Sequence, residues 1–477
     1  MGRTKRLAKN TLFVFIGNIG SKLMSFIMLP LYTSWLSPAD YGITDIISTY
    51  SVLLLNIIAC DVSDAIFVFP VGATQEKIRS YYSSGFFFQL FCSIIAAIFF
   101  FIFSNIESAN SFFSYSWFIY GVLISSMFQK YTQDFCRGIN KMSVFSFTGI
   151  INSGTIALFS ILLIPQWGIN GYVTALITAN IVTSIFTFFY SKSYRYLSLH
   201  SISCNDLKEM LHFSIPLMPT AIMWWLISGM NRPLLEEYHG LFAVGLLAVA
   251  SKLPSIMNLV FGFFQQAWLV TAIEEYKKDD FCQYYNKLFK VIFSCQMLAC
   301  IIITIAAKPF ILMMTTSQYI EAWKYIPLLA IAAIFSNISA YTGAIFSATR
   351  KTQFTFYSVI IGGLSSLIAN FALIPAYGLL GACLAIIIGH MLSSFSRIYF
   401  SAKFIKFKNH TFLIIQLTII IICYLCSFIQ HPIYRILTYI INTLFFIFYN
   451  KSLLLEAIIF IKNKKSNKKI SNIKKLK

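Results

Sequence analysis

Apolar stretches of about 20 residues recur along this sequence from one end to the other. An α-helix of that length crosses the hydrocarbon core of a bilayer. Only 11% of the 477 residues are charged, against about 25% in an average soluble domain. Too few charges remain to cover a water-exposed surface, so the pattern predicts an all-α polytopic membrane protein.

The apolar stretches predict about 14 transmembrane helices, each of roughly 20 residues or more. The predicted spans are 10–34, 41–69, 83–104, 112–134, 143–164, 168–190, 209–231, 241–270, 288–307, 322–346, 354–374, 378–402, 411–429 and 433–450. They leave no room for a soluble catalytic or nucleotide-binding domain. The sequence also has neither a phosphate-binding glycine loop nor a His-Glu-x-x-His pattern. We therefore expect no ATP hydrolysis by this chain, no cofactor and no metal site.

The basic residues are distributed unevenly between the predicted loops. Of the 37 Lys and Arg residues, 31 fall on one predicted side of the membrane. Short loops rich in Lys and Arg stay in the cytoplasm, so we predict that both termini are cytoplasmic. Membrane orientation and contact with anionic lipid thus explain most of the +20 net charge, and we expect no nucleic-acid partner. The six remaining basic residues are Lys22, Arg232, Lys252, Lys308, Lys324 and Arg435.

An internal repeat divides the chain. Residues 164–175 (IPQWGINGYVTA) recur 210 positions later as residues 374–385 (IPAYGLLGACLA), with Ile, Pro, both Gly and the final Ala matched. The offset covers six spans, so both copies enter the membrane in the same direction and their pseudo-twofold axis lies along the membrane normal. This predicts two six-helix lobes, 1–200 and 201–405, followed by a helix pair and basic tail at 406–477. Alternatively, Pro-aromatic-Gly-x-x-Gly is only a favourable turn between helices.

Several charged residues fall inside or at the ends of the predicted spans. Burying a charge in hydrocarbon costs a few kcal/mol or more, so such residues are candidates for function. Lys22 and Lys252 lie near the centres of the first and eighth spans, one in each predicted lobe. Asp61 and Asp64 are three residues apart, on one face of the second span. Arg232 lies where the seventh span reaches the outer side.

Two interpretations of these charges remain open. In the functional one, Lys22, Lys252 and Arg232 line a water-filled cavity that binds an anionic substrate. One of the two aspartates then carries a coupling proton or sodium ion. In the structural one, Lys22 pairs with an aspartate of the second span, Arg232 pairs with Glu236, and both pairs only hold helices together.

Three N-terminal segments carry a family resemblance: 17–23 (GNIGSKL), 29–33 (LPLYT) and 36–42 (LSPADYG). Together with the repeated Pro-aromatic-Gly-x-x-Gly motif, they resemble bacterial O-antigen and capsule flippases. These proteins form the polysaccharide-transporter branch of the multidrug/oligosaccharidyl-lipid/polysaccharide superfamily. The resemblance implies a transporter in which two lobes alternate access across the bacterial cytoplasmic membrane. Its expected cargo is an undecaprenyl-diphosphate-linked oligosaccharide repeat unit of O-antigen, capsule, exopolysaccharide or lipopolysaccharide, moved from the inner to the outer leaflet.

The resemblance also implies site residues and partners. Lys22 occupies a position where this branch often carries a cation, which makes it a candidate ligand of the diphosphate, and Asn18 and Ser21 of the same segment are candidate substrate-binding residues. A lysine, as a compact charge, suits phosphate. The implied partners are membrane lipid, a polysaccharide polymerase, a chain-length regulator, and a proton or sodium ion for coupling. Three alternatives remain: a cation-coupled multidrug exporter, a lipid II flippase of the same superfamily, and a non-transporting assembly partner of polysaccharide enzymes.

Overall fold

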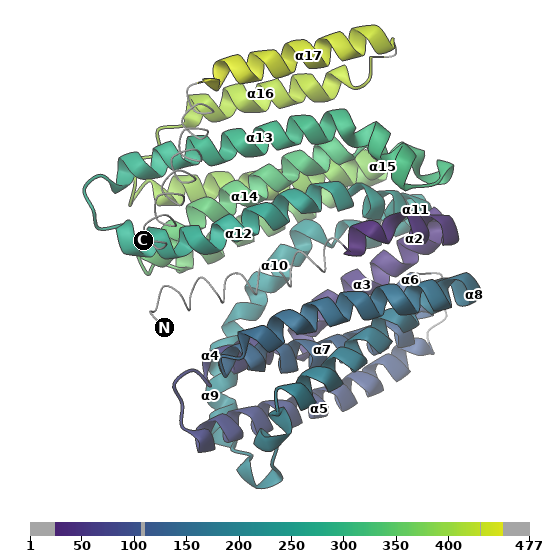
Figure 1. Ribbon diagram of the computed structural model, residues 1–477, viewed down its shortest axis with the longest axis vertical. Helices are drawn as coiled ribbons and strands as arrows, with labels where there is room; N and C mark the ends of the chain where they lie inside the picture. Colours follow the sequence, from purple (N-terminus) through teal and green to yellow (C-terminus); the bar gives the residue numbers. More distant parts are fainter. Residues whose placement is uncertain (1–23, 106–109, 430, 452–477) are drawn as a thin grey trace, which may run out of the picture. The chain divides into compact units, whose positions relative to one another are not determined.

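The computed structural model describes residues 24–105, 110–429 and 431–451, and all regular secondary structure in these ranges is helical (Figure 1). A helix satisfies the backbone N–H and C=O groups of an apolar segment internally, as a lipid environment requires. Seven helical segments in the described ranges are long and apolar enough to cross a membrane. Three of these segments contain 49, 49 and 72 residues, so each is long enough for more than one crossing. The predicted all-α polytopic fold is confirmed.

The described residues group into two compact units, which are considered separately below. Unit 1 takes in the described parts of Met1–Lys252, Ile311–Ala322 and Val359–Gly389; unit 2 takes in those of Leu253–Phe310, Trp323–Ser358 and His390–Lys477. These units follow spatial proximity, whereas the predicted lobes 1–200 and 201–405 follow the sequence repeat. The division into two repeat-related lobes therefore stays a prediction.

The first half of the described chain contains ten α-helices and three 3₁₀-helices. They are α2 (Leu29–Trp35), α3 (Pro38–Ile58), α4 (Val62–Val68), α5 (Gln75–Ser104), α6 (Ser111–Ser114), α7 (Ser116–Gly138), α8 (Met142–Tyr190), η1 (Ser193–Tyr196), η2 (Leu199–Ser201), α9 (Cys204–Ser214), η3 (Ile215–Leu217), α10 (Met218–Ser228) and α11 (Asn231–Ala250). In this part, α7 packs against α3, α4, α5 and α8, and α3 packs against α11.

The second half of the described chain contains six α-helices and one 3₁₀-helix. They are α12 (Lys252–Glu275), α13 (Phe281–Met314), η4 (Ser317–Lys324), α14 (Ile326–Ala348), α15 (Gln353–Ser401), α16 (His410–Cys426) and α17 (Pro432–Tyr449). The helices α16 and α17 lie side by side (Figure 1) and correspond to the helix pair predicted after the repeat.

The repeated motif has the same backbone geometry in both copies. Gly168 interrupts α8 with φ 53° and ψ −125°, and Gly378 interrupts α15 with φ 55° and ψ −128°. A positive φ is accessible to glycine without steric cost. The second glycine of each motif is Gly171 or Gly381. A Cβ on either glycine would collide with the carbonyl oxygen of the residue eight positions earlier, Leu163 or Leu373. Each copy is therefore a sharp kink between two helical halves, and both glycines are needed to form it.

A second pair of turns, outside the motif, also repeats with the 210-residue offset. Asn140 and Arg350 both have left-handed backbones, with φ 61° and 59°. The next residues, Lys141 and Lys351, donate their N–H groups to the carbonyls five positions back, at 2.7 and 2.8 Å. This is a Schellman-type helix end. The two halves thus share backbone conformation away from the motif, which favours a true repeat over an isolated turn motif.

Unit 2 contains a buried arginine. Arg397 of α15 is 4% exposed, and it donates from Nε to Ser358 Oγ at 2.9 Å and from Nη1 to Ser339 O at 2.7 Å. Gly343 of α14 lies against the guanidinium, since a Cβ there would stand 2.6 Å from Nη1. The charge count above places Arg397 with the basic residues of the cytoplasmic side, but its side chain is packed between helices and not exposed.

Candidate substrate-binding site

The helices α3 and α11 of unit 1 cross at a pair of glycines. A Cβ on Gly42 would collide with Leu241 O, and a Cβ on Gly245 would collide with Pro38 O. Each glycine thus faces the carbonyl of the residue four positions before the other glycine. The two helix backbones are therefore in contact. Small residues allow such close approach between helices in a membrane. The crossing brings the polar side chains of α3 within reach of those of α11.

The beginning of α3 is fixed by a capping box. Ser37 Oγ accepts a hydrogen bond from Asp40 N at 3.2 Å, and Asp40 Oδ2 accepts one from Ser37 N at 3.1 Å. Pro38 follows at the first helical position, where its missing N–H costs no hydrogen bond. This cap fixes the residue at which α3 begins.

Arg232 of α11 is held by Asp45 of α3. Its Nε donates to Asp45 Oδ2 at 2.9 Å, and its Nη1 donates to Asn231 Oδ1 at 2.8 Å and to Ser228 O. The two charged side chains are 13% and 23% exposed. The structural interpretation of Arg232 is therefore right about an ion pair and wrong about the partner, which is Asp45 and not Glu236.

Glu236 has a different role. Its Oε1 accepts a hydrogen bond from Ser111 N, at 2.6 Å, where the short helix α6 begins. Glu236 thus ties the segment before α7 to α11. The Arg232–Glu236 pair of the structural interpretation is not formed: Arg232 pairs with Asp45 across the α3–α11 contact, and Glu236 accepts a hydrogen bond from Ser111 at the beginning of α6.

Lys252 begins α12 and lines a cavity of about 220 Å³ in unit 1. The other lining residues are Met24, Ser25, Met28, Tyr32, Asn152, Ser153, Ile156, Tyr172 and Leu176. Among these described residues, Lys252 alone carries a charge. Its Nζ lies 5.7 Å from the centre of the Tyr41 ring, within the range of a cation–π contact. Asp45 and Arg232 are both near enough to act electrostatically on it.

Aromatic and amide groups complete this cavity. The rings of Tyr32 and Tyr172 meet edge to face with centroids 5.2 Å apart. Asn152 Nδ2 donates to Asn180 Oδ1 at 3.1 Å and to Thr183 Oγ1 at 3.3 Å. Such a polar network fixes side-chain orientations when its members are satisfied inside an apolar helix bundle. The cavity therefore combines one cation with rigidly held tyrosines and an amide.

The aspartates predicted for ion coupling lie in a separate cluster of unit 1. The predicted span 41–69 is broken at Cys60 and Asp61, whose φ values are 47° and 49°, so Asp61 precedes α4 and is not on a helical face shared with Asp64. Asp61 is buried at 5% exposure, whereas Asp64 pairs with Lys130 at 3.0 Å. Lys130 also acts electrostatically on Asp61 and on Asp134. Asp134 of α7 is a member of this cluster that the sequence did not single out.

A comparison with protein families decides the family. The model of a family described as "Polysaccharide biosynthesis protein" matches residues 7–270, more than half of the chain. The chain belongs to this polysaccharide biosynthesis family. The resemblance carried by residues 17–42 and by the glycine motif is thereby confirmed at the family level.

The chain is similar to one relative in sequence and to a solved structure in fold. It is 22% identical over 410 residues to the capsular polysaccharide biosynthesis protein CapF of Staphylococcus aureus, a match that covers 83% of this chain and 99% of the relative. Its fold is similar to the inward closed conformation of the lipid II flippase MurJ, with a TM-score of 0.72 at 16% identity over 94% of this chain and 100% of the other.

The same fold occurs in a multidrug resistance transporter. An inward-facing MATE family transporter of the MOP superfamily matches with a TM-score of 0.63 at 15% identity, covering 82% of this chain and 95% of the other. At these identities the likenesses show the fold, which is that of polytopic transporters.

Several predicted site residues of this family member lie outside the described residues. Lys22, Asn18 and Ser21 belong to the first 23 residues, so the structure neither supports nor opposes their predicted role. Met24 and Ser25, which come shortly after Lys22 in the sequence, line the cavity that contains Lys252. The cavity's Tyr32 and Tyr172 were not predicted, although Tyr32 belongs to the LPLYT segment and Tyr172 directly follows the second glycine of the first motif.

Proposed function

We propose that this protein is a flippase for an undecaprenyl-diphosphate-linked oligosaccharide repeat unit. It would carry the unit from the inner to the outer leaflet of the cytoplasmic membrane by alternating access, without making or breaking a covalent bond. Three findings support the proposal: membership of a polysaccharide biosynthesis family, a relative named for capsular polysaccharide biosynthesis, and a fold shared with a lipid II flippase. On this proposal both termini are cytoplasmic, and the implied polymerase and chain-length regulator use the delivered unit.

The observation that carries the proposal is the cavity at Lys252. A cation at membrane depth is costly, so Lys252 is a candidate functional residue. A lysine offers a diphosphate a compact charge with three donors, while Tyr32 and Tyr172 offer apolar ring faces with polar edges. Asn152, held by its own network, offers a fixed amide. This combination suits a ligand with an anionic linkage and a polar saccharide.

The same cavity weighs against a multidrug exporter as the chain's function. A cavity for cationic drugs is expected to present carboxylates, because like charges repel in a medium of low dielectric constant. The described lining presents a lysine and no carboxylate. We therefore favour an anionic substrate over a cationic one.

The cluster at Asp61 is our candidate for ion coupling. Asp61 is buried beside Lys130 and Asp64 at a break between α3 and α4. Adding a proton or sodium ion to a buried carboxylate changes the charge balance of its surroundings. A break between two helices is also a place where backbone angles can change with little loss of helical hydrogen bonding. We propose that Asp61 binds the coupling ion, with Asp64 and Lys130 setting the local charge.

The deciding experiment combines a cell assay with a vesicle assay. In cells that lack their own flippase, Lys252→Ala is expected to abolish surface polysaccharide while the protein still inserts at normal levels. The matched control is Lys278→Ala, which removes an exposed lysine paired with Glu275. In vesicles, the wild-type protein is expected to move the lipid-linked oligosaccharide between leaflets. Full translocation by Lys252→Ala would exclude the proposed role of Lys252, and no translocation by the wild type would exclude the flippase itself.

A further inference from the structure

We propose that unit 2 binds one anionic phospholipid of the surrounding membrane, independently of the transported substrate. Its headgroup would occupy a polar cleft at Lys287, Lys290 and Lys408. One of its acyl chains would lie in the apolar groove beside that cleft, along the beginning of α16.

The cleft forms where the beginning of α13 meets the segment before α16. Asn286 joins the two: its Nδ2 donates to Lys406 O at 2.9 Å, and its Oδ1 accepts from Lys408 N at 2.8 Å. Asn409 Nδ2 adds a bond to Asn286 O at 2.9 Å. Asn286 and Asn409 are both buried. The segment that carries Lys408 is therefore held against α13 by a buried amide network. The shape of the cleft is thus fixed by the fold.

The cleft has the volume and charge for a phosphodiester headgroup. It measures about 650 Å³. Its lining consists of Asp279, Asp280, Cys282, Gln283, Asn286, Lys287, Lys290, Lys408 and Asn409. Lys287 and Lys290 are three residues apart on α13 and so share a helical face. The three lysines exceed the two aspartates by one charge, which matches the single negative charge of a phosphodiester, and the aspartates can accept hydrogen bonds from headgroup hydroxyls.

The apolar groove begins at the same segment. Its volume is about 460 Å³, and it is lined by Phe395, Ile398, Tyr399, Ala402, Phe407, His410, Leu413, Ile414 and Leu417. Tyr399 and Ile414 are 72% and 65% exposed, so the groove opens outward on an apolar face. Phe407 and His410 line the groove, whereas Lys408 and Asn409 line the cleft, so the two hollows meet along this segment. A phospholipid has a polar headgroup next to apolar acyl chains. The polar cleft and the apolar groove are arranged in the same way, so one can hold the headgroup and the other an acyl chain.

The segment between α15 and α16 combines exposed lysines with buried apolar residues. In residues 403–408 (KFIKFK) the three lysines are exposed, whereas Ile405 and Phe407 are buried. Phe407 packs against Phe289 of α13, with ring centroids 4.9 Å apart. Lysines flanking apolar anchors are typical of the membrane–water boundary, where basic pockets between helices bind anionic headgroups.

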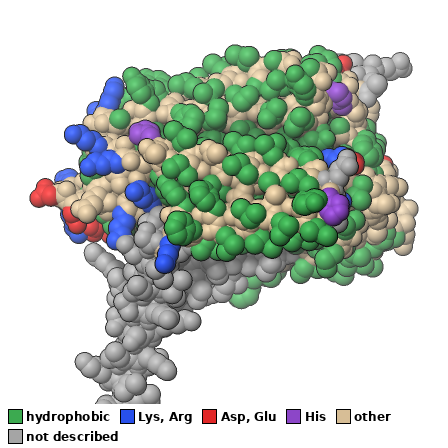
Figure 2. Space-filling view, turned by 90° about the horizontal axis from the view of Figure 1, so that it is seen from above, with side chains coloured by type: hydrophobic (Ala, Val, Ile, Leu, Met, Phe, Trp, Pro, Cys, Tyr) green, Lys and Arg blue, Asp and Glu red, His purple; other side chains and the backbone are tan. Residues whose placement is uncertain are grey.

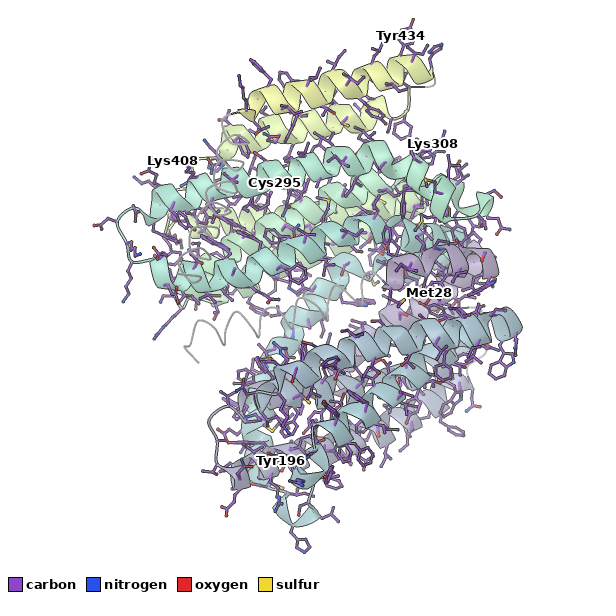
Figure 3. The ribbon with its side chains drawn as sticks, viewed as in Figure 1. Met28, Tyr196, Cys295, Lys308, Lys408 and Tyr434 are labelled. Atoms are coloured by element: carbon purple, nitrogen blue, oxygen red, sulfur yellow. The ribbon has the colours of Figure 1, made fainter. Side chains whose placement is uncertain are left out.

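The position of the cleft agrees with a membrane boundary. Figure 3 shows Lys408 at the end of unit 2 where α12 connects to α13, and Lys308 at the opposite end of the same unit. In Figure 2 the Lys and Arg side chains gather toward one edge, and the adjoining surface is largely hydrophobic. The residues around the cleft belong to loops predicted to be cytoplasmic by their Lys and Arg content. The occupant we infer is therefore a lipid of that leaflet with a hydroxyl-bearing anionic headgroup, such as phosphatidylglycerol.

Native mass spectrometry of the full-length protein in detergent tests this site. With added phosphatidylglycerol or phosphatidylcholine at equal concentration, we expect a stoichiometric phosphatidylglycerol adduct and roughly tenfold less phosphatidylcholine. The triple variant Lys287→Gln/Lys290→Gln/Lys408→Gln should lose this preference. The matched control Lys277→Gln/Lys278→Gln removes lysines of the same connection that do not line the cleft, and should keep it. Equal binding of the two lipids by the wild type, or an unchanged preference in the triple variant, overturns the proposal.

A second variant tests the groove. Ala402→Trp fills the groove, and we expect it to weaken phosphatidylglycerol binding roughly tenfold without touching a lysine of the cleft. Glycerol 3-phosphate, which has the phosphate but no acyl chains, should not compete at the same concentration. Competition by glycerol 3-phosphate would show that a free phosphate compound is the ligand. A lipid-free dimer that Ala402→Trp dissociates would show that a second copy of the chain covers the groove. Either result overturns the lipid site.

Discussion

Gly42 of α3 and Gly245 of α11 lie so close that neither position has room for a side chain, since each faces a backbone carbonyl of the other helix. This contact joins two helices that come from different halves of the sequence repeat. Backbone atoms cannot move aside as a flexible side chain can, so an added methyl group must separate the helices. The polar contacts beside the crossing depend on that close approach.

Gly42→Ala and Gly245→Ala are therefore expected to destabilise the protein. Overpacking a tight contact costs about 1–3 kcal/mol, which should lower the apparent unfolding temperature in detergent by several degrees. Gly262→Ala is the control, because a Cβ at Gly262 of α12 meets nothing within 4 Å. Thermal unfolding of the three variants gives the comparison. Equal unfolding temperatures for all three would contradict the proposed close packing.

The Asp45–Arg232 pair predicts an energetic coupling across the same crossing. Because both side chains are partly buried, removing one partner should cost roughly 1–3 kcal/mol, between the values for exposed and buried pairs. A double-mutant cycle with Asp45→Asn and Arg232→Gln measures the coupling. We expect the double variant to be more stable than the sum of the single losses predicts. Strictly additive losses would mean that the pair contributes nothing beyond its separate side chains.

The two motif glycines should differ in their tolerance of alanine. Gly168 and Gly378 share a positive φ with ψ near −125°, a combination that residues with a Cβ rarely adopt, so Gly168→Ala should cost about 1–3 kcal/mol from backbone strain alone. At Gly378 a Cβ would also stand 3.2 Å from the ring of His239, which hydrogen-bonds to Ile374 O. Gly378→Ala should therefore be the more damaging of the two in thermal unfolding. Greater damage at Gly168 would contradict this account of the repeat.

Asp61 and Asp64 should respond differently to neutralisation. If Asp61 binds the coupling ion, Asp61→Asn should make translocation in vesicles independent of an imposed proton or sodium gradient. Asp64→Asn removes the partner of Lys130, so its main effect should be a modest loss of stability, because that pair is substantially exposed. Initial translocation rates with and without each gradient separate the two. Unchanged gradient dependence in Asp61→Asn would exclude it as the ion site.

Much of the fold was predictable because single residues or short segments determine it. The apolar length of each span predicts a helix, and the spacing of the two motif glycines predicts a repeated junction. The break before α4 was not predictable in this way. Cys60 and Asp61 adopt left-handed backbones without a glycine or proline nearby to indicate it. Aspartate adopts a left-handed backbone more readily than most residues, but this preference is too weak to indicate a break, so the span 41–69 reads as one helix in the sequence.

The sequence pointed to the candidate site only through its charges. Lys252 and Arg232 stand out because cations are costly inside a membrane. Asp45, 187 residues away from Arg232, carries no local signal, since their contact depends on how α3 and α11 cross. The crossing depends in turn on two glycines whose importance is visible only when the helices are packed. Sequence spacing therefore suggested the wrong partner, Glu236, one turn away.

Arg397 provides a last test, in unit 2. Its guanidinium is fixed by Ser358 and Ser339 and lies against Gly343, so Gly343→Ala places a methyl group 2.6 Å from Nη1. Either the arginine moves and loses hydrogen bonds in a buried site, or α14 and α15 separate; both outcomes destabilise the protein by about 1–3 kcal/mol. Adding Arg397→Lys, whose ammonium is more compact, should recover part of that loss in thermal unfolding. If the double variant is instead less stable than the sum of the single changes predicts, steric conflict with the guanidinium is not the cause.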